Sequence, residues 1–187
     1  PGGAKANRSL LDHGTLYVAR FNADGTGNWI PLVHGQGALT TANGFADQGE
    51  VLIKARQASD ILGATKMDRP EWLAIDPNNG WVYCTLTNNN RRGTAVASVN
   101  LADGSTAAGS ARPPVDASNP REDNVHGHII RWRETGKTVN ATTFAWNLFA
   151  QAGDTLTAKI AKPTNDYKGN IVDVPNGSAD YGAPDGL

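Results

Sequence analysis

A hairpin of two apolar strands with a carboxylate at its entrance constrains this chain more than any other feature. Residues 67–77 read MDRPEWLAIDP and residues 80–89 read GWVYCTLTNN, so two strand-like runs flank an Asp-Pro-Asn-Asn-Gly turn. Such a turn between apolar runs is typical of an antiparallel hairpin. Glu71 begins the first run, where a charged side chain is costly unless a cation or hydrogen bonds hold it. The segment therefore predicts a β-fold and a candidate site for chemistry.

The composition favours turns and short strands. The chain has 187 residues with 21 glycines and 10 prolines, and 39% of its residues are hydrophobic, enough for one domain with a core. Its formal net charge of -1 gives no electrostatic basis for binding nucleic acid or an anionic membrane. No apolar run is long enough to cross a bilayer. We therefore expect neither nucleic acid nor a membrane as a partner.

The single cysteine and the two ends of the sequence bear on what the chain can do alone. Cys84 by itself excludes an internal disulfide framework and a thiolate metal cage. No signal peptide is visible, residues 1–3 lack an initiator methionine, and residues 184–187 stop where a strand is expected to begin. Because domains usually end in exposed polar segments, we expect residues 1–187 to be a single segment of a domain that is incomplete at both ends.

Strand-like runs recur along the chain with polar segments between them. Apart from the hairpin at 72–87, the alternation of apolar residues predicts four strands, at residues 15–21, 29–33, 128–133 and 142–149. The segment at 22–27 is rich in residues that accept positive φ and predicts a hairpin loop. The polar segments 90–125 and 151–183 are expected to be mostly loop.

One segment near residues 48–62 has the pattern of a helix. Asp47 and Glu50 form a capping-box sequence. Val51, Ala55, Ala58 and Leu62 then follow at helical spacing, and Gly63 is suited to end the helix.

Together these elements predict an all-β, mainly antiparallel fold with one inserted helix. Two or three short hairpins give too little sheet for an independent β domain. They are similar to blades of a β-propeller, in which a turn such as Asp-Pro-x-x-Gly-x-Val-Tyr joins neighbouring strands. No clean sequence period accompanies them, so the prediction of a partial β-propeller depends on the hairpins themselves.

Several motifs, in this order along the chain, resemble the PhoX-type alkaline phosphatase family of bacteria. They are GTLYVARF at 14–21, LGATKMDRPEW at 62–72, VYCTLTNN at 82–89, NPR at 119–121, HGHIIRWRE at 126–134 and PDGL at 184–187. Members of that family are exported six-bladed β-propellers that hydrolyse phosphate monoesters and hold iron and calcium ions at one end of the central channel. The resemblance implies that this chain supplies about two of the six blades.

The resemblance also implies roles for particular residues. Glu71, in the Arg-Pro-Glu-Trp motif, matches a metal ligand, and Asp185, in the Pro-Asp-Gly-Leu motif, is a second candidate ligand. The cofactors would be Ca²⁺ and Fe³⁺, and the location periplasmic or secreted. The cysteine ligand of the family lies upstream of this region, so Cys84 does not inherit that role. Because other blades and ligands are missing, we expect this segment alone to be inactive.

Glu71 and the asparagines that follow the hairpin each have a simpler interpretation. Glu71 is either a metal ligand or the partner of Arg69 in an ion pair, and the resemblance favours the ligand. Residues 88–90 are three asparagines, which offer oxygen ligands for calcium. They also suit a turn, because asparagine tolerates left-handed backbone geometry, and we favour the turn. Asp76 is expected only to cap the turn of the hairpin.

Three arginines and two histidines are further candidates. A guanidinium binds phosphate through two parallel hydrogen bonds, and Arg121, in a loop, is the best candidate to orient phosphate. Arg131 and Arg133 share one face of a strand, which favours an exposed face balanced by Glu134. His126 and His128 are two residues apart and suit one metal ion only if a third ligand is near, so we favour structural roles for both.

The sequence thus predicts part of a metal-dependent phosphatase that hydrolyses phosphate monoesters. Its partners would be the substrate and the remaining blades of the parent protein. An alternative is a non-catalytic β-propeller segment that acts as a binding module. A related alternative is a structural piece of an assembly whose partner chains cover its sheet edges. No glycine-rich phosphate loop and no Gly-x-Ser-x-Gly motif favours another phosphate or nucleophile chemistry.

Overall fold

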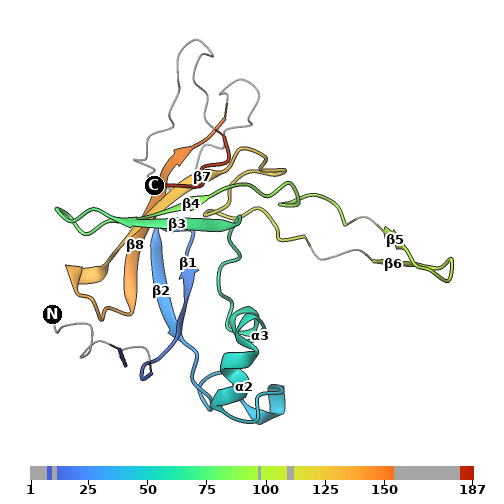
Figure 1. Ribbon diagram of the computed structural model, residues 1–187, viewed down its shortest axis with the longest axis horizontal. Helices are drawn as coiled ribbons and strands as arrows, with labels where there is room; N and C mark the ends of the chain where they lie inside the picture. Colours follow the sequence, from blue (N-terminus) through green and yellow to red (C-terminus); the bar gives the residue numbers. More distant parts are fainter. Residues whose placement is uncertain (1–7, 10–11, 97, 109–111, 154–181) are drawn as a thin grey trace. The chain divides into compact units, whose positions relative to one another are not determined.

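The computed structural model describes residues 8–9, 12–96, 98–108, 112–153 and 182–187 (Figure 1). The chain divides into two compact units. The first comprises residues 1–20 and 28–64, and the second comprises residues 21–27 and 65–187. Most regular structure is antiparallel β-sheet, with two short helices in the first unit. The predicted all-β, mainly antiparallel fold class is therefore confirmed.

The first unit contains most of a hairpin and both α-helices, whereas the second unit has only a short 3₁₀ helix, η2 (Thr135–Lys137), among its described residues. The elements of the first unit are β1 (Tyr17–Phe21), β2 (Thr26–Pro31), the 3₁₀ helix η1 (Thr41–Asn43), α2 (Gln48–Ile53) and α3 (Ala55–Ile61). The tip of the β1–β2 hairpin, residues 21–27, belongs to the second unit. At the open end of the hairpin the Leu32 amide donates to the Leu16 carbonyl at 2.8 Å. Both strands occur where the sequence predicts them, within a few residues.

The predicted helix begins as expected but is divided in two. The Asp47 carboxylate accepts the Glu50 amide at 2.8 Å, as in a capping box. The return bond is shifted by one residue, because the Glu50 carboxylate accepts the amide of Ala46. Lys54, at φ -93° and ψ 31°, leaves helical geometry and separates α2 from α3, so the prediction of one continuous helix is wrong in this detail. Gly63, at φ +72°, follows α3 as predicted.

The apolar face of these helices forms the core of the first unit. The fully or almost fully buried side chains there are Leu32, Leu39, Phe45, Val51 and Ala58, and the half-buried ones packed against them are Val18, Ala55 and Leu62. All four residues that the helical spacing predicts, from Val51 to Leu62, belong to this cluster. Each large side chain buried in this way contributes about 1.5–3 kcal/mol to folding.

The second unit is built on four strands that follow one another in the sheet in chain order. They are β3 (Pro70–Ile75), β4 (Val82–Leu86), β7 (His128–Glu134) and β8 (Thr143–Gln151), each antiparallel to the next. Beyond β8 the sheet continues with the tip of the β1–β2 hairpin, where the Trp146 amide donates to the Gly25 carbonyl at 2.8 Å. Four consecutive antiparallel strands are the arrangement of a propeller blade.

One face of this sheet is apolar and buried. Register places Cys84 opposite Ile130, Ile130 opposite Leu148, and Trp132 opposite Trp146, and all of these side chains are buried. Phe21, at the hairpin tip, packs edge-to-face on Phe144, Trp132 and Trp146 with ring centroids 4.9, 6.0 and 5.4 Å away. Only glycine fits at position 27, because a Cβ there would overlap the Phe144 ring.

The connection from β4 to β7, residues 87–127, is the longest segment between two strands of this sheet. It contains a small hairpin, β5 (Ser98–Asn100) and β6 (Thr106–Ala108), which the sequence analysis did not predict within a segment expected to be mostly loop. Each strand has only three residues and no clear alternation, but the Asp103-Gly104 turn between them was a usable signal. Within the part of the chain that the structure describes, no helix is long and apolar enough to span a membrane.

Candidate functional site

The entrance of β3 departs from regular strand geometry at Glu71. Pro70 pairs with Leu86 and Leu73 pairs with Cys84, so two residues, Glu71 and Trp72, oppose Thr85 alone. An arrangement of two residues against one is a β-bulge, a feature that re-aims side chains and is common beside active sites. The sequence did not predict this bulge, because a bulge depends on register between two strands.

The buried Thr85 side chain brings the two predicted metal ligands to one place in the fold. Its hydroxyl accepts the Trp72 amide at 3.0 Å and donates to the Asp185 carbonyl at 2.9 Å. Glu71 precedes Trp72, so the backbones of Glu71 and Asp185 lie side by side although they are far apart in sequence. Thr85 was not predicted as a site residue, since a threonine in a strand is ordinary in composition.

The Glu71 carboxylate has one cation within ion-pair distance in the described residues. Glu71 Oε1 lies 3.7 Å from Arg69 Nη2, and 37% of the Glu71 side chain and 62% of the Arg69 side chain are exposed. An ion pair of this length and exposure contributes little to stability. The Asp185 side chain is also exposed. Both carboxylates therefore remain accessible to a cation.

A hollow of about 360 Å³, here called the Arg69 hollow, lies beside this bulge. Its lining residues are Arg69, Asn88, Asn89, Asn90, Arg91 and Val125. Arg69 Nη1 donates to the Asn88 side-chain oxygen at 3.1 Å, and the Arg91 amide donates to the Asn89 side-chain oxygen at 3.0 Å. This second bond is that of an asparagine turn, the interpretation favoured for the three asparagines.

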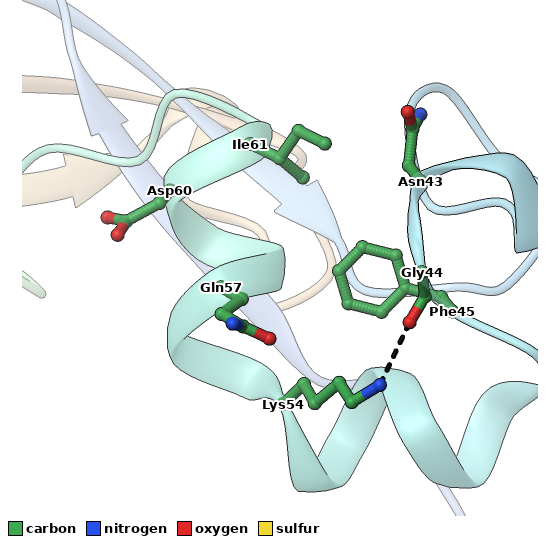
Figure 2. Close-up of a pocket in the computed structure, with 7 residues that line it drawn as sticks. All are labelled: Asn43, Gly44, Phe45, Lys54, Gln57, Asp60 and Ile61. Atoms are coloured by element: carbon green, nitrogen blue, oxygen red, sulfur yellow. Dashed lines mark hydrogen bonds between the residues drawn. The ribbon is translucent and has the colours of Figure 1, made fainter.

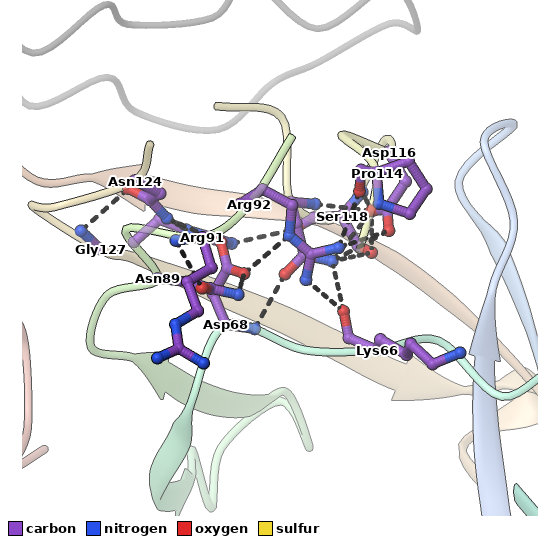
Figure 3. Close-up of polar contacts among 12 residues, drawn as sticks. Lys66, Asp68, Asn89, Arg91, Arg92, Pro114, Asp116, Ser118, Asn124 and Gly127 are labelled. Carbon is purple, nitrogen blue, oxygen red and sulfur yellow. Dashed lines mark hydrogen bonds and ion pairs between the residues drawn. The ribbon is translucent and has the colours of Figure 1, made fainter. Parts of the chain in front are cut away.

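Behind the hollow, the second unit contains a buried ion pair that the sequence analysis missed (Figure 3). Arg92 Nε donates to Asp68 Oδ1 at 2.8 Å, and neither side chain is exposed to solvent. The Asp68 carboxylate also accepts the amides of Asn89 and Asn124, each at 2.9 Å. The terminal nitrogens of Arg92 donate hydrogen bonds to the carbonyls of Lys66 and Pro114. Here we call Asp68, Asn89, Arg92 and Asn124 the Asp68 network.

The same network fixes a neutral histidine. His128 Nε2 lies 2.8 Å from the Ser118 carbonyl oxygen, and its Nδ1 lies 3.1 Å from the side-chain nitrogen of Asn124. A carbonyl needs a donor and an amide nitrogen needs an acceptor, so these partners suit the imidazole protonated on Nε2. Burial lowers the pKa of His128 to about 4. A structural role fits these contacts, as the sequence analysis favoured.

His126 and His128 do not form a pair on one strand face. His126 precedes β7, and Gly127 between the two residues has φ +75°. A Cβ at position 127 would overlap the carbonyl oxygens of Leu86 and Thr87, so only glycine fits this close approach.

Arg121 is buried in the second unit and donates hydrogen bonds to backbone carbonyls. Its Nη1 donates to the Ala152 carbonyl at 2.7 Å, and its Nη2 donates to the Gly127 carbonyl. These bonds connect the loop before β7 to the end of β8. Its role in orienting phosphate stays a prediction.

Arg131 and Arg133 lie against aromatic rings on the other face of the sheet. The Arg131 guanidinium carbon is 4.7 Å from the ring centroid of Trp81 and 5.1 Å from that of Phe149, and Arg133 is 5.0 Å from Trp81. Arg131 Nε also donates to the Asn147 side-chain oxygen at 2.9 Å. The shared face that the strand alternation predicts is confirmed, and the two cations are held mainly by aromatic rings.

Two further predictions concern Cys84 and Asp76. Cys84 is buried within the sheet, and burial raises the pKa of its thiol to about 11, which disfavours the thiolate that binds metal. The Asp76 carboxylate accepts the Asn78 amide at 2.9 Å and so caps the β3–β4 turn, as predicted.

The first unit has a hollow of its own, lined by residues 43–45, 54, 57, 60 and 61 (Figure 2). Its one cation, Lys54, donates to the Gly44 carbonyl at 3.0 Å and lies 3.1 Å from the Glu50 carboxylate. None of the residues predicted as a site lies there.

Across the described ranges, no group of three or more His, Cys, Asp or Glu side chains is arranged to hold a metal ion. Glu71 and Asp185 are thus a partial set of donors within this part of the chain.

Comparison with known proteins places the chain in a class of phosphatases. The family model described as alkaline phosphatase PhoX matches residues 1–180. The chain therefore belongs to the PhoX alkaline phosphatase family. It is similar to the solved structure of Pseudomonas fluorescens PhoX in complex with vanadate, a transition state analogue, with 45% sequence identity and a TM-score of 0.76. That alignment covers 98% of this chain and 29% of the Pseudomonas chain. The comparison with curated protein sequences gave no match.

Proposed function

We propose that this chain is part of a metal-dependent phosphatase that hydrolyses phosphate monoesters. Membership of the PhoX family supports the reaction class. The observation that carries the assignment to this chain's own residues is the Thr85 hydroxyl, which joins the Glu71–Trp72 bulge to the backbone of Asp185. Because the chain spans 29% of the length of the Pseudomonas protein, the activity is proposed for the complete gene product.

Glu71 and Asp185 are the proposed metal ligands. Carboxylate oxygens suit hard cations, so the donor chemistry fits the Ca²⁺ and Fe³⁺ that the sequence resemblance implies. The number of donors is incomplete, since no third side chain of a metal-binding type joins them within the described residues. The remaining ligands would come from outside these residues. Once bound, such ions stabilise the charge that develops on phosphoryl oxygens.

The protein's own contribution is to hold these carboxylates in position. The bulge at Glu71 and the hydrogen bonds of Thr85 fix the backbone on which the Glu71 and Asp185 side chains are carried. Arg121 is proposed to help orient phosphate. Arg121 donates to two backbone carbonyls, one of them in the loop before β7. These bonds support a positioning role, in which Arg121 fixes the conformation of that loop.

The first test is the activity and metal content of the complete gene product. Hydrolysis of p-nitrophenyl phosphate is measured beside elemental analysis for iron and calcium. We expect Glu71→Gln to lower both metal content and kcat/KM, because an amide oxygen is a weaker ligand than a carboxylate. Glu122→Gln, at another exposed glutamate, is the matched control and is expected to retain both. Full metal content and activity in Glu71→Gln would exclude Glu71 as a ligand.

A second candidate function is a non-catalytic binding or assembly module. The observation that favours it is the edge strand β3, on which Trp72, Leu73 and Ile75 are more than half exposed. If the complete gene product releases no phosphate and elutes from size exclusion in a stable complex with other chains, this function would be supported. Phosphate release that depends on Glu71 would exclude it as the sole role.

We further propose that the complete protein is periplasmic or secreted. This location is what the resemblance of the sequence motifs implies. Cell fractionation with an antibody against this chain tests it, and recovery only with cytosolic markers would contradict it.

A further inference from the structure

We propose that the Arg69 hollow binds an anionic group on the alcohol part of the phosphate ester, so that the enzyme favours esters that carry a carboxylate or a second phosphate. This inference deepens the proposed function and rests on it. Its evidence is the charge, the backbone geometry and the position of the hollow in the second unit.

The hollow lies next to the proposed metal ligand. Arg69, one of its lining residues, is two positions before Glu71, and the closest atoms of that ion pair are 3.7 Å apart. Residues 88–91, which follow β4, also line the hollow. Its volume of about 360 Å³ is on the order of ten times the roughly 30 Å³ that one water occupies in the liquid, so a phosphate or carboxylate group has room. An ester whose phosphoryl group lies at Glu71 would therefore extend its alcohol part into the hollow.

The lining has positive charge and no carboxylate. Its two cations are Arg69 and Arg91, and its remaining polar side chains are asparagines. The Arg91 side chain has no hydrogen-bond or ion-pair partner within the described residues. In Figure 3 its guanidinium extends away from the buried Asp68–Arg92 pair. Two guanidinium groups in one lining favour an anion. Arg91 offers two parallel N–H donors to a phosphate or carboxylate, and Arg69 adds positive charge although its terminal nitrogens already contact Asn88 and Glu71.

Arg69 is held in a backbone conformation that non-glycine residues rarely adopt. Its φ is +53°, and its carbonyl accepts both the amide and the hydroxyl of Thr87 at 3.2 Å. Such conformations persist where the surroundings impose them, and they are concentrated at functional sites. Here the buried Asp68, immediately before Arg69, supplies that constraint.

The same buried residue also holds Asn89 and Arg91 of the lining in place. Asp68 accepts the side-chain amide of Asn89, and the Asn89 side-chain oxygen in turn accepts the Arg91 amide. The backbones of Arg69 and Arg91 are therefore both anchored to the Asp68 carboxylate, that of Arg69 by direct sequence adjacency and that of Arg91 through Asn89. An anion that binds between them would pay little for ordering the backbone, which is the benefit of preorganisation.

The test compares two esters that differ in one charge. 3-Phosphoglycerate has a carboxylate where glycerol 3-phosphate has a neutral hydroxymethyl group. For the complete gene product, kcat/KM for each ester is measured at constant ionic strength, and the ratio of the two is the readout. We expect a ratio well above one in the wild type and a fall of about tenfold in Arg91→Gln, the effect of losing one charge-assisted hydrogen bond.

Two variants separate specificity from general damage to the fold. Arg91→Lys retains the charge and is expected to keep most of the ratio, while losing the two-pronged geometry. Arg56→Gln removes an exposed arginine on α3 of the first unit and is expected to leave the ratio unchanged. A change of fold alone lowers both kcat/KM values together and does not change their ratio. An Arg91→Gln ratio equal to that of the wild type would overturn the proposal.

Isothermal titration with the same two compounds separates this proposal from the proposed function. If the wild type hydrolyses neither ester, the proposed function is wrong. The hollow is then judged by affinity, and 3-phosphoglycerate should bind about tenfold more tightly to the wild type than to Arg91→Gln. Equal affinity in the two proteins would exclude the hollow as an anion site.

Discussion

Replacing Asp68 by asparagine is expected to destabilise the second unit by about 3–5 kcal/mol, the usual cost of removing one partner from a buried ion pair. The substitution removes the closest counter-charge of the buried Arg92 guanidinium and leaves only the Asp116 carboxylate, 3.6 Å from Arg92 Nη1 and itself partly exposed. It also creates a conflict of donors. The carboxylate accepts three N–H groups, from Arg92, Asn89 and Asn124, on its two oxygens. An asparagine has one oxygen, so its NH₂ group must face at least one donor.

Urea denaturation followed by tryptophan fluorescence measures this effect, because Trp132 and Trp146 are buried in the same unit. With a slope of about 2 kcal/mol/M, the midpoint should fall by roughly 2 M. Asp103→Asn is the matched control, since Asp103 is exposed and bonds only to Ser105 among the described residues. Its midpoint should change by about 0.3 M or less. A fall of less than about 0.5 M for Asp68→Asn would refute the importance of the buried pair.

Three further predictions follow from buried groups of the second unit. The folded-state pKa of His128 is about 4, below the ordinary value of 6.5, so its contribution to stability is present above pH 6.5 and is lost as pH falls towards 4. Denaturation midpoints measured from pH 7 to pH 4 should therefore fall with pH. His128→Gln should make this fall smaller. Gly127→Ala is expected to cost more than about 2 kcal/mol, because its Cβ would overlap the carbonyls of Leu86 and Thr87 at a positive φ, and a midpoint within experimental error of the wild type would contradict this. The Cys84 thiol, buried and with its pKa raised to about 11, should react with a thiol reagent such as DTNB only on unfolding, and rapid reaction of the folded protein would contradict its burial.

The elements that the sequence predicted well are those set by local signals. The hairpin at 72–87 has a strong turn and two apolar runs, and the helix start at Asp47 has its own capping residues. The break at Lys54 could not be predicted, because nothing in the local sequence departs from a helical pattern there. In the structure the Lys54 ammonium donates to the Gly44 carbonyl, a contact outside the helix that the local sequence does not reveal.

The candidate site was predicted only in part, for a similar reason. Glu71 was conspicuous as a charge in an apolar run, whereas Asp68, three residues earlier, resembled an ordinary polar residue before a strand. Its partner Arg92 is 24 residues away, and their pairing depends on how the β4–β7 connection folds back. Thr85 likewise has no sequence signal, because its role comes from register with the bulge and from a carbonyl 100 residues away.

The position of Glu71 on β3 connects the candidate site to the way the sheet is covered. Leu73 lies opposite Cys84, and cross-strand partners share a face, so Leu73 belongs to the same face as the buried core. Yet 61% of Leu73 is exposed, whereas Cys84 is only 6% exposed. The apolar face of the sheet thus extends onto its edge strand, where nothing in the described residues covers it. Whatever protein surface covers β3 would also hold the strand that carries Glu71, so the geometry of the proposed metal ligand and the burial of this edge are expected to depend on each other.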